Sequence, residues 1–327
     1  MTKSIRSTAQ CEAAANNSVS RGRARQGHNR SGVPPPQTSA LGILVAAAIS
    51  ISFSPIIVKL LGRHLIGPIS IAFWRTLIGG LILVVIAKLE HKTLRLAAVP
   101  LTWCLFTGFF FSLDLTFWHY AIIDIGSGMA TLLANTHVLA TAVISYLVFK
   151  EKITLRYKLA APAGIVGLAL LVGVLSQEVA FTPLYLRGVM FGLGSALMYA
   201  FYMVGIKKAR DHHSETAPAA IMAWICLTAA VFLSIGSFFE KKPSLPPNLV
   251  AAALLLLLAV VGQALAWWGI VHSIKKIAIH HAALILLLQP SLAMLWGYLL
   301  FNETLAVSQL MGAAITLTAI YVGSIRK

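Results

Sequence analysis

The residues GSGMATLLANTHVLATAVISYLVFKEKITLRYK, from Gly126 to Lys158, return in related form as AIHHAALILLLQPSLAMLWGYLLFNETLAVSQL, from Ala278 to Leu310. An ungapped offset of 152 positions aligns the two stretches and places Tyr-Leu-x-Phe-x-Glu at the end of each apolar run. Each stretch contains an apolar segment long enough to cross a bilayer as a helix. The agreement indicates an internal repeat.

The composition favours a polytopic helical membrane protein. Of the 327 residues 58% are hydrophobic and only 11% are charged, whereas a soluble domain carries about 25% charged residues. A net charge of +16 would suggest a nucleic-acid partner in a soluble protein. The cysteines Cys11, Cys104 and Cys226 lie far apart and show neither a disulfide framework nor metal-ligand spacing.

Hydropathy divides the chain after a polar, basic tail of residues 1–38 into ten apolar segments of spanning length. We expect the tail to be disordered and cytoplasmic and to contact anionic lipid, with a transit peptide as the alternative. The expected segments are 40–61, 68–88, 99–122, 126–149, 157–175, 187–206, 217–239, 248–272, 279–301 and 306–325.

The fold class predicted from these segments is an all-α integral membrane protein with ten transmembrane helices. The repeat offset spans five helices, so residues 39–176 and 177–327 each form one five-helix repeat. Five is an odd number of crossings, so the second repeat is inverted relative to the first. Glu151 is then expected at the cytoplasmic surface and Glu303 at the outer surface, where each ends a helix outside the site.

The positions of Lys and Arg predict the orientation. With both termini cytoplasmic, twenty of these residues lie on the inner side and five on the outer side, while Arg75 lies inside the second segment. This asymmetry follows the positive-inside rule. Topology therefore explains most of the positive charge, and we expect a multi-pass protein of the cell (inner) membrane with no nucleic-acid partner.

Several features together resemble the drug/metabolite transporter superfamily, in particular its EamA-type exporters. They are the ten segments, the repeat, Phe73-Trp74-Arg75 in the second segment and the two Phe-x-Glu helix ends. The resemblance covers residues 40 to 325 and implies efflux of a small metabolite. Members of the family often carry a proline midway in helices 4 and 9. Pro290 supplies it in helix 9, but Val138 occupies the aligned position in helix 4.

Arg75 and Asp114 are ionisable residues inside apolar segments, where a charge is costly and faces a partner or a cavity. Their similar depth and opposite charge suggest a buried pair. The pair is either static or rearranges when a substrate enters. In the second case Arg75 holds a carboxylate by bidentate hydrogen bonds, and Asp114 takes a proton or an amine.

Polar and aromatic residues extend this candidate site. Asn135 and His137 lie near the middle of the fourth segment, and Gln289 occupies the position aligned with His137. They form either a midplane binding site or ordinary hydrogen bonds between helices. The aromatic candidates for the cavity wall are Trp118, Tyr199, Tyr202, Trp267 and Trp268.

These observations favour a secondary active transporter that exports a small metabolite, such as an amino acid, by alternating access with proton coupling or exchange. No catalytic motif, metal cluster or cofactor signature is visible, so we expect no enzyme activity and no cofactor. An uncoupled facilitator or channel and an intramembrane enzyme that acts on a lipid stay open as alternatives. The expected partners are a small-molecule substrate and the bilayer, and a homodimer is left open.

Overall fold

The structure, a computed structural model, describes residues 36–64, 66–91, 93–96, 98–150, 154–174, 179–211, 218–242, 244–274, 277 and 279–324. Most of the predicted basic tail, and Glu151, lie outside these residues. The regular elements of the described ranges are helices. They are α2 (Pro36–Ser52), α3 (Ser54–Arg63), α4 (Pro68–Leu89), α5 (Ala98–Ile125), α6 (Ser127–Asn135), α7 (His137–Phe149), α8 (Leu155–Val172), α9 (Pro183–Asp211), α10 (Pro218–Phe238), α11 (Leu249–Leu257), the π-helix η1 (Leu258–Leu265), α12 (Ala266–Ile274), α13 (Ile279–Leu286), α14 (Leu288–Phe301) and α15 (Val307–Ser324).

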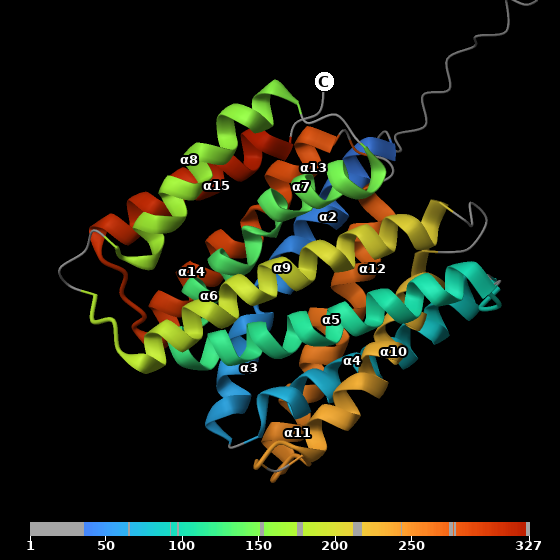
Figure 1. Ribbon diagram of the computed structural model, residues 1–327. Coiled ribbons are helices and arrows are strands. Elements are labelled where there is room, and N and C mark those ends of the chain that lie inside the picture. The colour runs from blue at the N-terminus through green and yellow to red at the C-terminus, as the bar shows by residue number, and fades with distance from the viewer. Residues whose placement is uncertain are drawn as a thin grey trace, which may run out of the picture. The chain divides into compact units, whose positions relative to one another are not determined.

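These elements correspond to the ten predicted segments (Figure 1). Within the described residues, nine helical spans are long and apolar enough to cross a membrane, and Val307–Gly323 adds a shorter apolar helix. The first span joins α2 to α3, the fourth joins α6 to α7, the eighth joins α11, η1 and α12, and the ninth joins α13 to α14. The predicted all-α membrane architecture is confirmed.

The aligned ends of the two repeat stretches have the same backbone geometry. Lys150 ends α7 in the left-handed region at φ 55°, and Asn302 ends α14 in the same region at φ 54°. The Glu303 carboxylate accepts hydrogen bonds from the backbone N–H groups of Ser127 and Gly128, at the start of α6. Since Lys150 lies at the far end of that span, the fourth and ninth spans run in opposite directions. We call the two ends of the bundle the Lys150 face and the Glu303 face.

Three spans are interrupted in the middle. The α2–α3 break falls at Phe53, two residues before Pro55. The breaks in the fourth and ninth spans fall at Thr136 and Leu287. The fourth span therefore breaks without a proline. At this break the backbone N–H and the side-chain hydroxyl of Thr136 both bond to the carbonyl oxygen of Leu133, which replaces the regular helical pattern locally.

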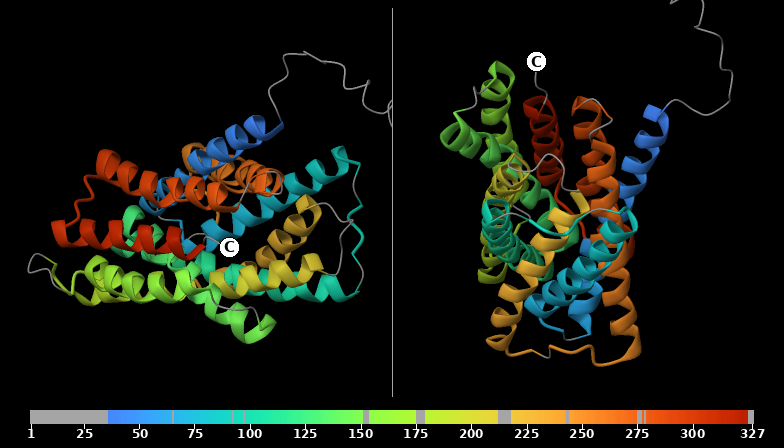
Figure 2. Two further views of the ribbon diagram at one scale, coloured as in Figure 1. Left: turned by 90° about the horizontal axis from the view of Figure 1, so that it is seen from above. Right: turned by 90° about the vertical axis from the view of Figure 1, so that its right-hand side faces the viewer.

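The main helix interfaces join the two halves of the sequence. Helix α5 packs along α9, α4 packs along α10, and α8 packs along α15. Helix α2 packs against α12 and α14, as the views in Figure 2 also show. Small residues allow these close approaches. A Cβ atom added at Gly192 of α9 would lie 2.8 Å from Leu133 of α6. The halves are therefore interleaved, and side chains from both meet in the interior.

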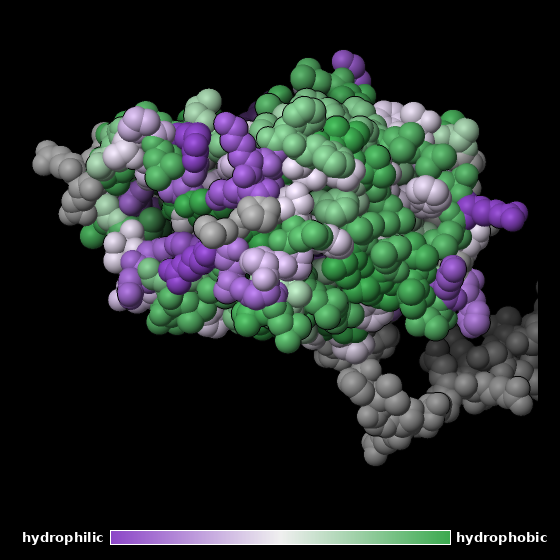
Figure 3. All heavy atoms as spheres, turned by 90° about the horizontal axis from the view of Figure 1, so that it is seen from below, coloured by the Kyte–Doolittle hydropathy of each residue, from purple (hydrophilic) through white to green (hydrophobic). Residues whose placement is uncertain are grey.

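The outer surface of the bundle is apolar. Figure 3 shows a broad hydrophobic area on one face with hydrophilic residues to either side of it. Large apolar side chains that would be buried in a soluble protein stay exposed here, among them Leu155 (71%) and Leu159 (70%) of α8. An exposed apolar surface of this extent suits contact with lipid.

Candidate functional site

Arg75 is a buried cation whose nearest hydrogen-bond partners are neutral. Its side chain lies in α4 and is only 2% exposed. Its Nε donates to Oε1 of Gln263 at 2.8 Å, and Nη2 donates to the carbonyl oxygen of Gly262 at 3.3 Å. The guanidinium carbon lies 5.5 Å from the ring centre of Trp118 in α5, within cation–π range. The third nitrogen, Nη1, is buried without a hydrogen-bond partner.

The π-helix η1 supplies the partners of Arg75. A π-segment shifts backbone bonds from the i→i+4 to the i→i+5 pattern, so carbonyl groups become available to side chains, often at functional sites. The Gly262 carbonyl oxygen accepts from Arg75 and lies 3.5 Å from the Ser54 hydroxyl. The Gln263 side chain also contacts Cys226, with Nε2 3.3 Å from Sγ. This element therefore connects the eighth span to three others.

Asp114 lies in α5, and its carboxylate is 5% exposed. It accepts a hydrogen bond from the hydroxyl of Ser195 in α9 at 2.6 Å. The direct ion pair expected between Arg75 and Asp114 is not formed. Among the described residues the ion pairs are Lys59–Glu303 and Arg187–Asp124. Other groups already hold both side chains, although the two charges lie close enough to interact through space.

Aromatic rings form a continuous chain beside Arg75. The ring centre of Tyr202 lies 4.8 Å from that of Phe111 in a stacked arrangement, 5.0 Å from Tyr199 and 6.0 Å from Trp267. Tyr199 in turn lies 4.2 Å from His137. The structure thus brings Tyr199, Tyr202, Trp267 and His137 together, as the sequence suggested, and adds Phe111 to them.

Arg75, its partner Gln263, Trp118 and the aromatic chain beside them are called the cluster below. Several of its buried polar atoms have no hydrogen-bond partner. They are Nη1 of Arg75, Nε1 of Trp118, Nε1 of Trp267 and Nδ1 of His137. Buried polar groups in proteins are nearly always paired, and an unpaired donor costs about 1–3 kcal/mol. The arginine and tryptophan atoms can only donate. The cluster therefore has a surplus of donors, which suits a ligand that accepts hydrogen bonds.

Three of the predicted site residues have their contacts with other parts of the bundle. The amide of Asn135 donates to the carbonyl oxygen of Thr131 within α6 at 2.8 Å. Gln289 is half-buried at the start of α14, which packs on α6 and α2. Trp268 donates from Nε1 to the Glu90 carboxylate at 2.9 Å and stacks on His272 at the Lys150 face. The pairing of His137 with Gln289 in one site stays a prediction.

A small cavity connects the cluster to the Lys150 face. Its volume is about 50 Å³, and its lining includes Trp267, Trp268, Met222 and Glu90. Met222 also touches the cluster, because its sulfur lies 3.8 Å from the Tyr202 hydroxyl. A cavity of this size holds one or two water molecules. It gives the aromatic chain a polar neighbour on the Lys150 side.

At the Glu303 face, two carboxylates from the second half cap helices of the first half. Glu303 binds Ser127 and Gly128 at the start of α6 and pairs with Lys59. Glu240 accepts hydrogen bonds from the backbone N–H groups of Ile69 and Ser70 at the start of α4, both at 3.1 Å. Both carboxylates lie at a helix N-terminus, where the helix dipole favours a negative charge.

The electrostatics of Glu303 follow from these contacts. Burial alone would raise the pKa of this carboxyl, but the hydrogen bonds from Lys59 and from the Ser127 and Gly128 backbone bring its pKa below the usual value. The sequence placed Glu303 at a membrane surface as a simple helix end. Its side chain is instead mostly buried in contacts between the two halves. A cavity of about 360 Å³ adjoins it, lined also by Asp124 and Tyr185.

Comparisons with known proteins agree with this architecture. Residues 38–173 and 186–325 each match the family described as the EamA-like transporter family. The chain belongs to the EamA-like transporter family. The resemblance to the drug/metabolite transporter superfamily is thereby confirmed, and the EamA-like chain is a multi-pass membrane protein.

Similar proteins support the same assignment. A protein of Archaeoglobus fulgidus named "Uncharacterized transporter" is 29% identical to the EamA-like chain over 173 residues, which are 53% of this chain and 58% of that relative. The chain thus spans little more than half the length of this relative. A crystal structure titled "Crystal structure of protein" has a TM-score of 0.60 at 19% identity and covers 88% of this chain and 96% of its own. This likeness concerns the fold.

Sequence reasoning missed Gln263, Gly262 and Ser195. Gln263 carried a signal that was overlooked, because it is a polar residue within the long apolar run of the eighth span. Gly262 carried no signal, since its role depends on the π-helix that frees its carbonyl. Ser195 is one of several serines in apolar segments, and only the packing of α9 on α5 selects it.

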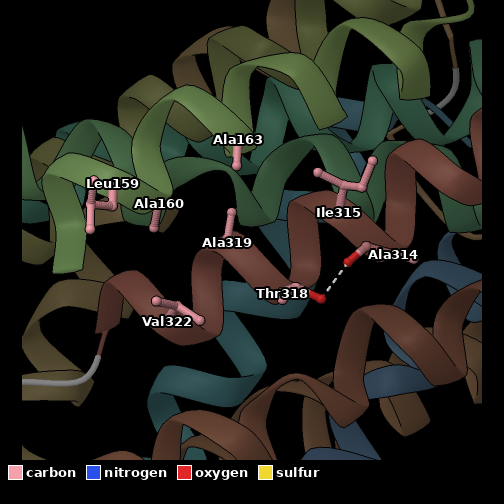
Figure 4. A pocket seen from close by; sticks show the side chains of 8 residues that line it. All are labelled: Leu159, Ala160, Ala163, Ala314, Ile315, Thr318, Ala319 and Val322. Carbon is pink, nitrogen blue, oxygen red and sulfur yellow. Dashed lines mark hydrogen bonds between the residues drawn. The ribbon is translucent and has the colours of Figure 1, made fainter.

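An apolar groove on another part of the EamA-like chain is unsuited to a polar metabolite. It has a volume of about 420 Å³ and lies between α8 and α15 (Figure 4). Its lining is aliphatic except for Thr318, whose hydroxyl donates to the Ala314 carbonyl oxygen at 2.8 Å. The polar group of the groove is therefore already satisfied within its own helix.

Proposed function

We propose that this EamA-like protein is a secondary active transporter that exports a small metabolite by alternating access. The observation that supports this proposal is the buried donor-rich cluster, to which both halves of the sequence contribute. Arg75 and Trp118 come from the first half, and Tyr202, Gln263 and Trp267 come from the second. A site at the seam between repeats binds substrate while one bundle rocks against the other.

The two faces differ in a way that suits export. At the Glu303 face, the carboxylates of Glu240 and Glu303 hold the starts of α4 and α6, and the cavity of about 360 Å³ beside Glu303 has no residue of the cluster in its lining. The Lys150 face has the small cavity that reaches Trp267. The positive-inside rule makes the Lys150 face cytoplasmic. In this proposal the protein lies in the inner membrane of the cell, and both of its termini are cytoplasmic. The substrate enters from the cytoplasm.

Asp114 is the candidate for proton coupling. A carboxylate inside the hydrocarbon region is costly, so such residues commonly mark substrate or proton pathways in transporters. Asp114 is buried, bonds to Ser195 across the α5–α9 interface and forms no ion pair with Arg75. Protonation would change both its charge and its hydrogen bond to α9. Exchange of one metabolite for another is the alternative form of coupling.

The test is counterflow in proteoliposomes that contain the purified protein. Vesicles are loaded with a mixture of unlabelled amino acids and organic acids, and uptake of each labelled compound is measured. We expect at least one compound to show trans-stimulation that is lost in Arg75→Gln and kept in Arg63→Gln, since Arg63 is exposed. Uptake without trans-stimulation would instead indicate a facilitator, and chemical conversion of a compound would indicate an enzyme.

A further inference from the structure

We propose that Arg75 and Trp118 form the subsite for an anionic group, and that the substrate is a planar organic acid bound through its carboxylate. This inference rests on the proposed transport function and names the chemical class of the cargo. It is carried by a buried cation that forms no salt bridge among the described residues, by two buried donors without acceptors and by an aromatic surface beside them.

The first argument concerns charge. Arg75 as a residue is 2% exposed, so its guanidinium has lost its hydration, and burying an ion in this way is strongly unfavourable unless an opposite charge accompanies it. Arg75 has only the oxygens of Gln263 and Gly262, which are neutral. Asp114, the carboxylate that shares this region, bonds to Ser195 instead. Among the described residues Arg75 therefore has no carboxylate at salt-bridge distance, and a bound anion would supply one.

The second argument concerns hydrogen-bond donors. Nη1 of Arg75 and Nε1 of Trp118 are both buried and both lack a partner. They belong to side chains in direct contact, with the guanidinium 5.5 Å from the indole ring centre. Neither atom can accept a hydrogen bond, so an ammonium ion would satisfy neither of them, and a neutral amine, which has a single lone pair, would satisfy only one. The two oxygens of a carboxylate would accept hydrogen bonds from both donors. The bond to the guanidinium would join two charged groups, and such hydrogen bonds are stronger than those between neutral groups.

The third argument concerns the body of the ligand. Trp118, Phe111, Tyr202 and Trp267 supply aromatic ring faces to one buried core, in which the Tyr202 ring contacts those of Phe111 and Trp267. Flat rings pack favourably against such faces in stacked or edge-on arrangements. A carboxylate attached to a planar apolar body therefore matches both parts of the cluster. A compact, fully hydrated anion would leave the aromatic part of the cluster unused.

The experiment compares benzoate, benzamide and benzylamine as ligands of the full-length protein in detergent. The three have similar size and differ in charge. Ligand binding raises the thermal unfolding midpoint. We expect benzoate to raise it in a concentration-dependent way, and the other two compounds to have little effect. Trp118→Phe keeps the aromatic face and removes only the N–H donor, so it should weaken benzoate binding about tenfold. Arg75→Gln should weaken it about a hundredfold.

The controls are Trp103→Phe in the same helix and Arg63→Gln, both of which should bind benzoate as the wild type does. If Arg75→Gln does not fold, Trp118→Phe and its control still test the subsite. Equal stabilisation by benzamide, stabilisation by benzylamine alone, or no response to benzoate would overturn the inference. The proposed function is tested separately, because counterflow of a cationic or neutral compound would leave the transporter standing while this inference fell.

Discussion

Gly126 is the residue at which backbone conformation and charge are most tightly linked. Its φ of 91° lies in a region that residues with a Cβ rarely adopt. A Cβ atom at this position would also lie 2.8 Å from Cδ of Glu303. The bend at Gly126 lets α6 begin directly after α5, with its first N–H groups pointing at that carboxylate. One glycine thus positions a helix start and an interhelical contact together.

Gly126→Ala should therefore destabilise the protein by about 1–3 kcal/mol, because it combines a strained backbone with displacement of Glu303. The matched control is Gly42→Ala in α2, where an added Cβ meets nothing within 4 Å. That change should be neutral or slightly stabilising, since alanine favours a helix over glycine. Thermal unfolding in detergent measures both variants. An equal loss of stability in the two variants would show that neither the backbone conformation of Gly126 nor its contact with Glu303 contributes to the stability.

The pH dependence of stability provides a second test at the residue scale. The pKa of Glu303 lies below its ordinary value of 4.5 in the folded protein. A lowered pKa means that the carboxylate stabilises the fold fully above its unfolded-state pKa and loses this effect as the pH falls through the folded-state pKa.

Glu303→Gln should lower stability by about 1–2 kcal/mol at neutral pH, because the hydrogen bonds to Lys59 and the α6 N-terminus lose their charge. The difference between wild type and variant should then shrink below pH 4.5. Unfolding midpoints measured over a pH series give this difference. A difference that stays constant down to acidic pH would contradict the assignment.

At the scale of single elements, irregular helices place the candidate site. The breaks at Phe53, Thr136 and Leu287 change the direction of spans one, four and nine in the bundle interior. The π-helix turns a carbonyl and an amide of the eighth span toward Arg75. Irregular backbone inside a membrane is tolerated where it is buried within protein or lines a cavity. Of these irregular elements, the π-helix contacts the donor-rich cluster directly, through Gly262 and Gln263.

The break at Thr136 leads to a prediction about proline. Val138, the position aligned with Pro290, is the second residue of α7, and Pro55 occupies the same kind of position in α3. Proline is tolerated in the first turn of a helix, where the N–H has no intrahelical partner. Val138→Pro should therefore fold with nearly unchanged stability. Val143→Pro, in the exposed middle of α7, should cost about 3 kcal/mol. Expression yield and unfolding midpoint compare the two. An equal loss of stability in the two variants would show that α7 does not begin at the break, so that the N–H of Val138 has an intrahelical partner.

At the scale of the whole bundle, the two halves of the sequence are interleaved. The pairs α5–α9, α4–α10 and α8–α15 each join the first half to the second. A rocking motion must therefore break contacts along these interfaces. The carboxylate caps of Glu240 and Glu303 lie on the same face, so opening that face requires both to release their helices. Asp114 and Ser195 lie on the α5–α9 interface, where protonation would act directly on the contact between halves.

The orientation of the halves is tested by labelling single cysteines from each side of the membrane. In a background without native cysteines, Lys150→Cys should react with an impermeant reagent from the cytoplasmic side. Asn302→Cys should react from the other side. The two residues end spans that run in opposite directions, so the labels should never share a side. Labelling of both from one side would end the proposal of inverted repeats.

The sequence by itself determined the class and the outline of this protein. Ten apolar segments, a repeat offset of 152 residues and the distribution of Lys and Arg are properties of the chain that need no packing to be seen. Because lipid requires every backbone group to be paired within its own segment, apolar runs of this length must be helices. The sequence also indicated Arg75, Trp118, Tyr202 and Trp267, since polar or aromatic residues within such runs are conspicuous.

Only the tertiary structure decided which of these residues meet. Whether Arg75 binds Asp114 or Gln263 depends on the π-helix in the eighth span, which no periodicity in the sequence reveals. Trp268 has the same residue type as Trp118 and Trp267, and Asn135 carries a side-chain amide as Gln263 does, but their helix positions give them other partners. From the sequence, Glu303 was predicted only to end a helix at the membrane surface, and the packing of α14 on α6 makes it a cap. Contacts between distant segments depend on how helices bend and cross, and that geometry is a property of the folded bundle.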